Sequence, residues 1–346
     1  MAKKTKIRLG ILFVFLLFIF ATGCDLIKKD SKSGEVSTDF KRGAAGLVME
    51  FVPNYPGDRY VLSEGIDEDI LIMIDLKNKG TYPEGDHFGN GQIHISGFDS
   101  GIIDMDKKRK DLIDEDMFLP AASSINPLGG FSTVEFEGEI IAEKITIDEY
   151  NPTILATACY PYVTKASPTV CIDPQPFDDR QEKVCHIGSR TLETQGAPVA
   201  VTKIDQEAST NKIQFKIAIE NVGSGDVLTP ALDAKGKDIF GKCDPWNSET
   251  LGRKDFDRVQ LKEIKIGNVD LLSNGKCNPF ADGTKGTTNL IRLFNGEGFV
   301  ICTLTVSKLG DAQSAYTTPL NIELEYNYRS TISKSISISK LTSVGG

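Results

Sequence analysis

The sequence of 346 residues is poor in the residue types that most often carry chemistry. It holds one tryptophan and three histidines, and its acids outnumber its bases, so the net charge is −9. This composition argues against a histidine-rich metal enzyme and a basic nucleic-acid binder. No Cys-x-x-Cys, Gly-x-Ser-x-Gly, His-Glu-x-x-His or phosphate-loop motif occurs. We therefore predict no catalytic residues, no metal site and no cofactor, and a protein that is not an enzyme.

A long apolar run lies close to the amino terminus. Basic residues within positions 3–8 precede the apolar run Leu9 to Phe20, and small residues follow it up to Cys24. This order is typical of a secretory signal, and the run is shorter than the roughly 20 residues of a spanning helix. We predict a signal peptide over residues 1–23. The alternative is an uncleaved signal anchor over Ile7 to Ile27, and in both cases the chain lies outside the cytoplasm.

The segment Ala21-Thr22-Gly23-Cys24 resembles the lipobox of prokaryotic lipoproteins. In that family cleavage falls just before the cysteine, whose thiol carries a diacylglycerol. Ala21 departs from the family pattern, which more often has leucine there. The resemblance covers only residues 1–24 and implies that lipid on Cys24 anchors the chain to the cell membrane. Residues 24–45 would then comprise the lipidated cysteine and a flexible tether, because they are small and polar.

Beyond residue 45 the apolar residues recur with a period of two. Four segments show the alternation: 134–140, 213–219, 302–307 and 322–328. The pattern predicts half-buried antiparallel strands. Short strands with Gly, Asn and Pro turns between them favour β-sandwiches. The predicted fold is all-β, with two tandem immunoglobulin-like antiparallel sandwiches after an N-terminal lipoprotein signal helix. A charged stretch near 102–118 is predicted to be a solvated loop or a short helix between strands.

The two halves of the chain share short motifs in one order. The matches are 75–80 with 218–223, 93–99 with 264–270, Gly130-Phe131 with Gly298-Phe299, and Tyr160-Pro161-Tyr162 with Tyr326-Asn327-Tyr328. Four ordered matches predict an internal repeat, with an insertion in the second half near 228–258. The expected parts are a first sandwich over 46–194, a linker over 195–198, a second sandwich over 199–341 and a tail over 342–346.

The strand and turn over residues 212–227 resemble the CARDB and related immunoglobulin-like modules of prokaryotic surface proteins. Those modules are seven-stranded sandwiches, found in tandem, that mediate adhesion or space other domains. The resemblance covers one strand pair per repeat and implies a non-catalytic binding, adhesive or structural module at the cell surface. The alternative is an accessory subunit of a transporter, pilus or secretion apparatus that docks through sandwich edges or loops. The expected partner is an unknown envelope protein or surface ligand, and not nucleic acid.

Six cysteines remain once Cys24 is assigned to lipid. They are Cys159, Cys171, Cys185, Cys243, Cys277 and Cys302. An even number in an exported chain suggests three disulfides. We predict Cys171–Cys185 and Cys277–Cys302, because each closes a short loop. Cys159 and Cys243 would then form a bridge between the domains or be free.

Most other polar features are expected to be solvated surface. His87 lies in a Gly-rich loop where a cation is the alternative, and His94 alternates outward between two isoleucines. His186 follows a cysteine, but a reactive pair needs proximity in space rather than in sequence. The acids around 104–116 lack the spacing of a calcium loop, so weak calcium binding is only the alternative there.

Trp246 lies on the inserted segment beside Cys243. A lone tryptophan on an inserted loop is a candidate contact residue for a partner. The alternative, which we favour, is that Trp246 folds back and covers the edge of a sheet.

Overall fold

The computed structural model describes residues 41–114, 117–178, 182–230, 239–281, 288–309 and 314–341. They belong to one compact unit, Thr38–Gly346. The predicted signal peptide, Cys24, most of the tether and the tail lie outside the described residues. No helix in the described ranges has the length and apolar character needed to cross a membrane.

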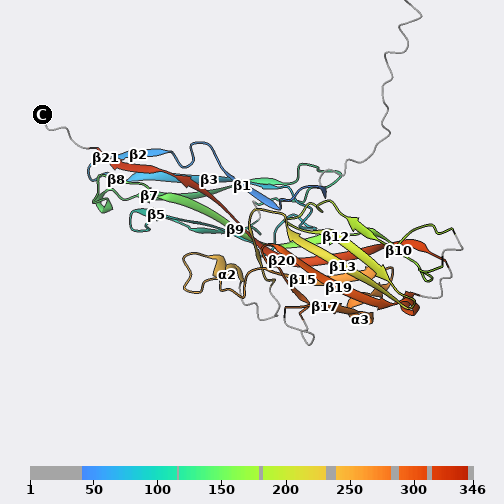
Figure 1. Cartoon of the computed structure of the whole chain (residues 1–346). Coiled ribbons are helices and arrows are strands. Elements are labelled where there is room, and N and C mark those ends of the chain that lie inside the picture. Colours follow the sequence, from blue (N-terminus) through green and yellow to red (C-terminus); the bar gives the residue numbers. More distant parts are fainter. Residues whose placement is uncertain are drawn as a thin grey trace, which may run out of the picture. The chain divides into compact units, whose positions relative to one another are not determined.

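The all-β prediction is confirmed, since half of the chain is in strands and 6% is in helices. None of the sheets closes on itself (Figure 1). The helices of the described residues are short: α2 (Ile239–Cys243), α3 (Leu271–Asn274) and the 3-10 turns Ala142–Lys144 and Val306–Leu309. The short-helix alternative for the stretch near 102–118 is wrong, because residues of this stretch pair as the short strands β5 (Ile103–Met105) and β6 (Arg109–Asp111).

Two sheets, one from each half of the chain, share a strand order. The first runs β1 (Leu47–Phe51), β3 (Glu68–Asn78), β7 (Phe131–Ile140) and β5. The second runs β11 (Ser189–Thr191), β12 (Val199–Ala208), β13 (Lys212–Asn221), β19 (Glu297–Thr305) and β17 (Lys276–Asn278). The order β1-β3-β7-β5 thus matches β12-β13-β19-β17, as the predicted repeat requires. In β13 the alternating isoleucines and Phe215 are buried, which confirms the period-two prediction.

A nine-stranded sheet belongs to both halves. Its path is β16 (Val269–Asp270), β15 (Arg258–Ile266), β20 (Tyr316–Ser335), β9 (Thr153–Ala166), β4 (Gln92–Ser96) and β6. Off this path, β10 (Thr169–Ile172) and β14 (Asp226–Leu228) pair with β20, and β18 (Leu290–Arg292) pairs with β15. A small sheet of β2 (Arg59–Leu62), β21 (Ser337–Lys340) and β8 (Glu149–Tyr150) completes the fold.

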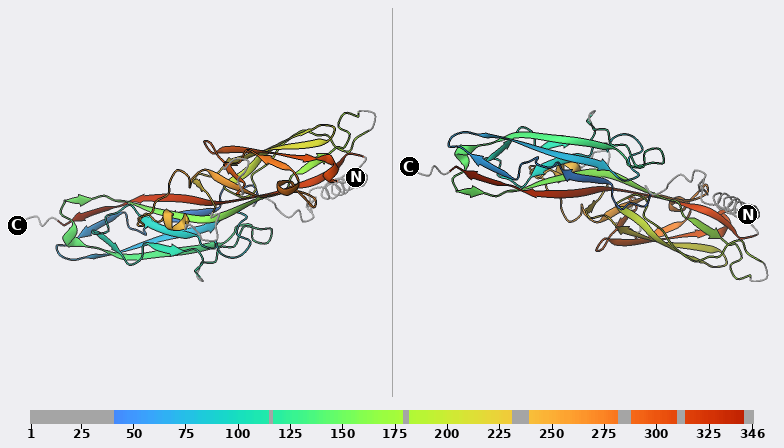
Figure 2. Two further views of the ribbon diagram at one scale, coloured as in Figure 1. Left: turned by 90° about the horizontal axis from the view of Figure 1, so that it is seen from below. Right: turned by 90° about the horizontal axis from the view of Figure 1, so that it is seen from above.

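The β9–β20 ladder joins the two halves. All 14 residues of β9 pair antiparallel with β20, without a break in register, and Figure 2 shows β20, in red, running from one group of strands into the other. The pair Pro161↔Asn327 lies at the centre of the matched tyrosine motifs, so a local pseudo-twofold axis passes there. The carboxyl-terminal strand β21 pairs with β2 and β8 of the first half. The ranges 46–194 and 199–341 stay predictions, and the chain crosses back between them.

Four buried tyrosines surround this axis and explain the repeated motif. Tyr160, Tyr162, Tyr326 and Tyr328 contact one another through their rings at 5.7–6.4 Å between centroids. Their hydroxyls bond backbone groups: Tyr160 with Leu47, Tyr162 with Gly196, Tyr326 with Val199, and Tyr328 with Gly225. Each apolar ring is therefore buried while its polar end is satisfied.

The two matched Asn-x-Gly turns adopt one arrangement. The side-chain amide of Asn78 donates to the carbonyl of Tyr82, and that of Asn221 donates to the carbonyl of Gly225, both at 2.9 Å. In each case the bond spans four residues and closes the turn that follows a central strand. The repeat therefore extends to side-chain hydrogen bonds.

Alkaline solution is expected to unfold the protein steeply above pH 10. Burial raises the pKa of Tyr328 to about 12 and also raises the pKa values of the other three buried tyrosines. Above pH 10 the unfolded state loses phenolic protons that the folded state keeps. Between pH 10 and its raised pKa, each such tyrosine lowers the unfolding free energy by about 1.4 kcal/mol per pH unit. Below pH 10 the tyrosine is protonated in both states, so its full contribution to the unfolding free energy is present.

The free energy of unfolding, measured in urea at several pH values above 9, checks this expectation. In Tyr328→Phe the unfolding free energy should fall less steeply with pH, by the contribution of about one proton, because the phenylalanine does not titrate. Tyr55→Phe is the control, since the Tyr55 side chain is exposed. An unchanged alkaline slope in Tyr328→Phe would contradict the assignment.

Candidate functional site

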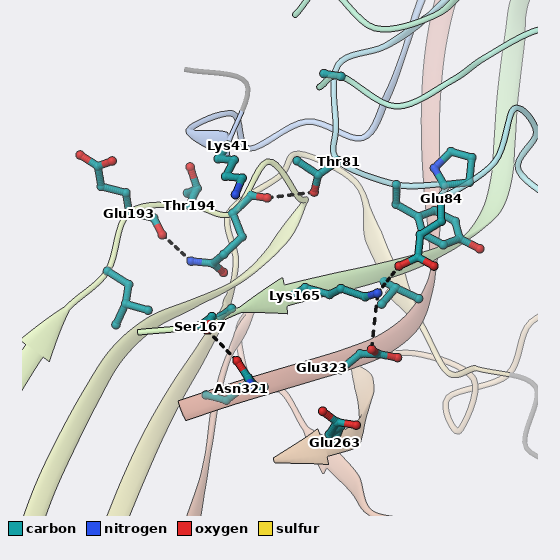
Figure 3. A pocket seen from close by; sticks show the side chains of 18 of the residues that line it. Lys41, Thr81, Glu84, Lys165, Ser167, Glu193, Thr194, Glu263, Asn321 and Glu323 are labelled. Atoms are coloured by element: carbon teal, nitrogen blue, oxygen red, sulfur yellow. Dashed lines mark hydrogen bonds and ion pairs between the residues drawn. The ribbon is translucent and has the colours of Figure 1, made fainter. Parts of the chain in front are cut away.

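A groove of about 1240 Å³ lies beside the end of β9. Its floor is the stretch Val163–Pro168, one wall is the loop of residues 81–89, and a second wall is the segment Leu192–Gln195 that follows β11 (Figure 3). Lys41, Ala122, Glu263 of β15 and residues 321–323 of β20 complete the lining. The groove therefore brings together parts of both halves of the chain.

The floor of the groove is an open strand edge. Leu320 N–H donates to the carbonyl of Pro168, so in the antiparallel ladder the even-numbered residues of β9 bond to β20 and the odd-numbered ones face away. On that far side β4 covers β9 only from Leu155 to Cys159. Among the described residues, no strand pairs with Val163 and Lys165 on this side. Their N–H and C=O groups consequently face the groove.

An ion-pair network holds one side of the groove. The ammonium of Lys165 bonds the carboxylate of Glu84 and lies 3.8 Å from that of Glu323, and Figure 3 shows it pointing between the two. The hydrogen bond with Glu84 is the largest cause that raises the pKa of Lys165, and the same bond lowers the pKa of Glu84. The network links the loop of residues 81–89 to β9 and β20 along this side of the groove.

Neutral hydrogen bonds and a further ion pair hold the other walls. The hydroxyl of Thr81 donates to the carbonyl of Gln195 at 3.0 Å, and that of Ser167 donates to the side chain of Asn321 at 2.6 Å. The carboxylate of Glu193 bonds the guanidinium of Arg42 at 2.8 Å. The groove is therefore preformed and offers backbone groups together with charged side chains, among which the carboxylates outnumber the ammonium groups.

Sequence reasoning missed this edge, although one signal for it is present. Pro161 lies inside β9, and proline within a strand marks an edge because it cannot donate to a ladder. The alternation over residues 160–166 predicts the face of the sheet that is buried, but it carries no information about the neighbouring strand.

The three disulfides confirm the predicted cysteine pairing. Cys171–Cys185 and Cys277–Cys302 close the two short loops, and Cys159–Cys243 links β9 to α2 in the insertion across 84 residues. Of the two alternatives for Cys159 and Cys243, the bridge is the one observed. Disulfides of this kind are typical of proteins that fold in an oxidising compartment outside the cytoplasm.

Trp246 packs against the first half of the chain. Its indole N–H donates to the carbonyl of Ile95 at 2.8 Å, and its ring lies 5.6 Å from that of Phe98. The ammonium of Lys108 lies 4.8 Å from the ring centroid. The side chain is still 40% exposed. A role for Trp246 in partner binding stays a prediction, and these contacts hold the insertion against β4.

The prediction that His94 lies on the surface is wrong. The side chain is fully buried, and its Nδ1 lies 3.6 Å from Oδ1 of Asp244 in the insertion. The alternation assigned this face of β4 to solvent. The insertion covers it, because the Cys159–Cys243 bridge and Trp246 bring residues 239–256 onto the strand.

The remaining histidines lie apart from one another. His87 lines the groove, and its Nδ1 lies 2.7 Å from the carbonyl of Met117. His186 lines a smaller cavity with Asp173 and Lys183, whose side chains form a 2.8 Å ion pair. In the part of the chain that the structure describes, no three His, Cys, Asp or Glu side chains are placed to hold a metal ion.

Together these features define a mostly β, β-sandwich-like, disulfide-bonded protein with a preformed groove at an open strand edge. No protein-family model matches the chain, and no curated protein matches it. Two solved structures are weakly similar. The C-terminal domain of the AgI/II polypeptide BspA from Streptococcus agalactiae has 8% identity and a TM-score of 0.16, with 86% of this chain and 100% of that chain covered. The CupB6 tip adhesin from Pseudomonas aeruginosa has 9% identity and a TM-score of 0.17, with 85% and 97% covered. Scores this low carry no argument about function.

Proposed function

We propose that this chain is a non-catalytic surface lipoprotein whose described part is a stiff binding, adhesive or structural module. The observation that carries the proposal is the unbroken β9–β20 ladder, which belongs to both halves of the chain. A continuous pair of strands resists bending at the junction, unlike a short linker between separate domains. The Cys159–Cys243 bridge reinforces the ladder, because it links β9 to the insertion. A stiff, oxidised module suits a role in presenting a binding surface away from the cell.

The anchor in this proposal is lipid on Cys24, and the CARDB-like resemblance of residues 212–227 is its second support. Cleavage before Cys24 would leave the polar tether between the membrane and the β-module. The disulfides support an extracytoplasmic location. The accessory-subunit alternative is favoured by a specific observation, the open edge of β9, because exposed strand edges are common docking points.

Cys24→Ser is expected to abolish membrane anchoring by lipid. In a bacterial host, the wild-type chain should lose residues 1–23, gain the mass of a diacylglycerol group and partition into detergent. The serine variant lacks the thiol that carries the lipid, so it should keep residues 1–23 and gain no such mass. Intact mass of the membrane fraction measures both results, and protease treatment of whole cells reports surface exposure.

Gly23→Ala is a matched control, because it keeps a small residue before the cleavage point. A wild-type chain that is uncleaved and carries a free Cys24 thiol would replace the lipoprotein with a signal-anchored protein. A chain that is protected from protease in intact cells would contradict the surface location.

A further inference from the structure

The pseudo-twofold axis relates the open edge of β9 to an edge of β20 that is already occupied. The motif match that aligns Tyr160 with Tyr326 also aligns Pro161 with Asn327 and Val163 with Arg329. In the second half, β14 pairs antiparallel with Asn327, Tyr328 and Arg329. The fold therefore contains one copy of this edge with a strand added to it.

The first half lacks its own copy of that strand. Residues 75–80 match residues 218–223. When this alignment is continued along the chain, Pro83–Gly85 correspond to the residues of β14. Pro83 has no N–H to donate to a ladder, and residues 83–85 form no strand. Instead they line the groove, and Glu84 bonds Lys165. The space beside Val163 and Lys165 is the groove itself.

We propose that an extended peptide segment of a partner protein adds to this edge of β9 as a new strand. The proposal rests on the proposed binding role and names its partner class. The N–H and C=O groups of Val163 and Lys165 supply two donors and two acceptors at the spacing of an extended chain. In the second half, the guanidinium of Arg329 bonds the carboxylate of Asp226 at 2.7 Å. In the first half the position that corresponds to Arg329 is Val163, which has no charge to pair with a carboxylate. The peptide residue beside Val163 is therefore uncharged.

The structure also explains why this edge is specific. Pro161 closes it at one end, because its nitrogen faces this edge and carries no proton. The Lys165–Glu84 ion pair bounds it along the side. These features limit the added strand to a short segment that fits between the walls, and they protect the edge from unrestricted pairing.

The test uses the full chain, with its disulfides intact, as bait for a displayed library of random peptides of about nine residues. The best peptide is then synthesised and titrated. Val163→Pro removes one edge N–H and none of the N–H groups that bond to β20, since odd-numbered residues do not bond to β20. We expect Val163→Pro to weaken binding about tenfold. Val163→Thr is the matched control, because it keeps the N–H and the β-branched shape, and its affinity should equal that of the wild type.

Amide hydrogen exchange on the wild-type chain gives a readout that needs no variant. The amides of Val163 and Lys165 should exchange rapidly in the free protein and slowly with the peptide bound, whereas those of Tyr162 and Thr164 are protected in both states. Three results would overturn the proposal. They are failure to enrich any peptide, equal affinities of Val163→Pro and Val163→Thr for the peptide, and protection from exchange only at amides other than those of Val163 and Lys165. Dimerisation that is lost in Val163→Pro would overturn it in favour of a second copy as occupant. None of these results depends on Cys24, so they are separable from failure of the anchoring proposal.

Discussion

The double variant Cys159→Ala/Cys243→Ala is expected to lose about 4–5 kcal/mol of unfolding free energy, because its bridge closes a loop of 84 residues. Cross-linking constrains the unfolded chain more strongly as the closed loop lengthens. The bridge also holds the insertion, with Asp244 and Trp246, over β4. Its loss should therefore free this segment as well as weaken the fold.

Trp246 is the only tryptophan, so its fluorescence reports on the insertion directly. The variant should show a red-shifted emission in the absence of denaturant, together with a lower urea midpoint. Cys171→Ala/Cys185→Ala is the matched control, since its bridge closes only 14 residues and predicts a loss of about 3 kcal/mol. That control should leave the tryptophan emission unchanged. A smaller loss for the 159–243 bridge than for the control would contradict the expectation.

Tyr326→Ala is expected to lose about 3–5 kcal/mol, the cost of truncating a large buried aromatic side chain. The ring is fully buried and stacks on Tyr162 at 5.7 Å between centroids. Its hydroxyl accepts the N–H of Val199 at 3.1 Å and lies 2.9 Å from the hydroxyl of Thr164. The alanine leaves a cavity and a buried N–H without its acceptor, and both effects are unfavourable.

The location of Tyr326 makes a second expectation testable with the same variant. Most buried apolar residues of both halves form one continuous cluster around the ladder, so the two halves should unfold together. Circular dichroism, which follows all strands, and Trp246 fluorescence should give coincident urea transitions in the wild type and in the variant. Tyr316→Ala is the control, because Tyr316 is only partly buried at the start of β20, and it should cost about 1 kcal/mol. Two separate transitions would show that the halves are independent.

The proposed function depends on stiffness rather than on reactive groups. The ladder, the tyrosine cluster and the bridge set the two halves as one body, and the groove beside Val163 provides a preformed edge. An added strand would gain affinity from main-chain hydrogen bonds while paying little to reorganise the protein.

Features that depend on near neighbours in the chain could be predicted from the sequence alone. The alternation of residues 213–219 predicts the burial of β13, because the side chains of a strand point to opposite faces in turn. The spacing of Cys171 and Cys185, and of Cys277 and Cys302, favours the short loops that these bridges close. The tyrosine motifs predict equivalent positions in the two halves, and those positions surround the axis.

The pairing of segments that are far apart in the sequence could not be predicted and is known from the folded chain. The crossing of β20 into the first half, the burial of His94 and the open edge at Val163 all depend on such neighbours. Period-two alternation gives the face of a strand but not its partner strand, because every strand offers the same backbone groups to either side. In this protein the proline at position 83, the bridge at Cys243 and the packing of the tyrosines select the partners, and that selection leaves one edge open.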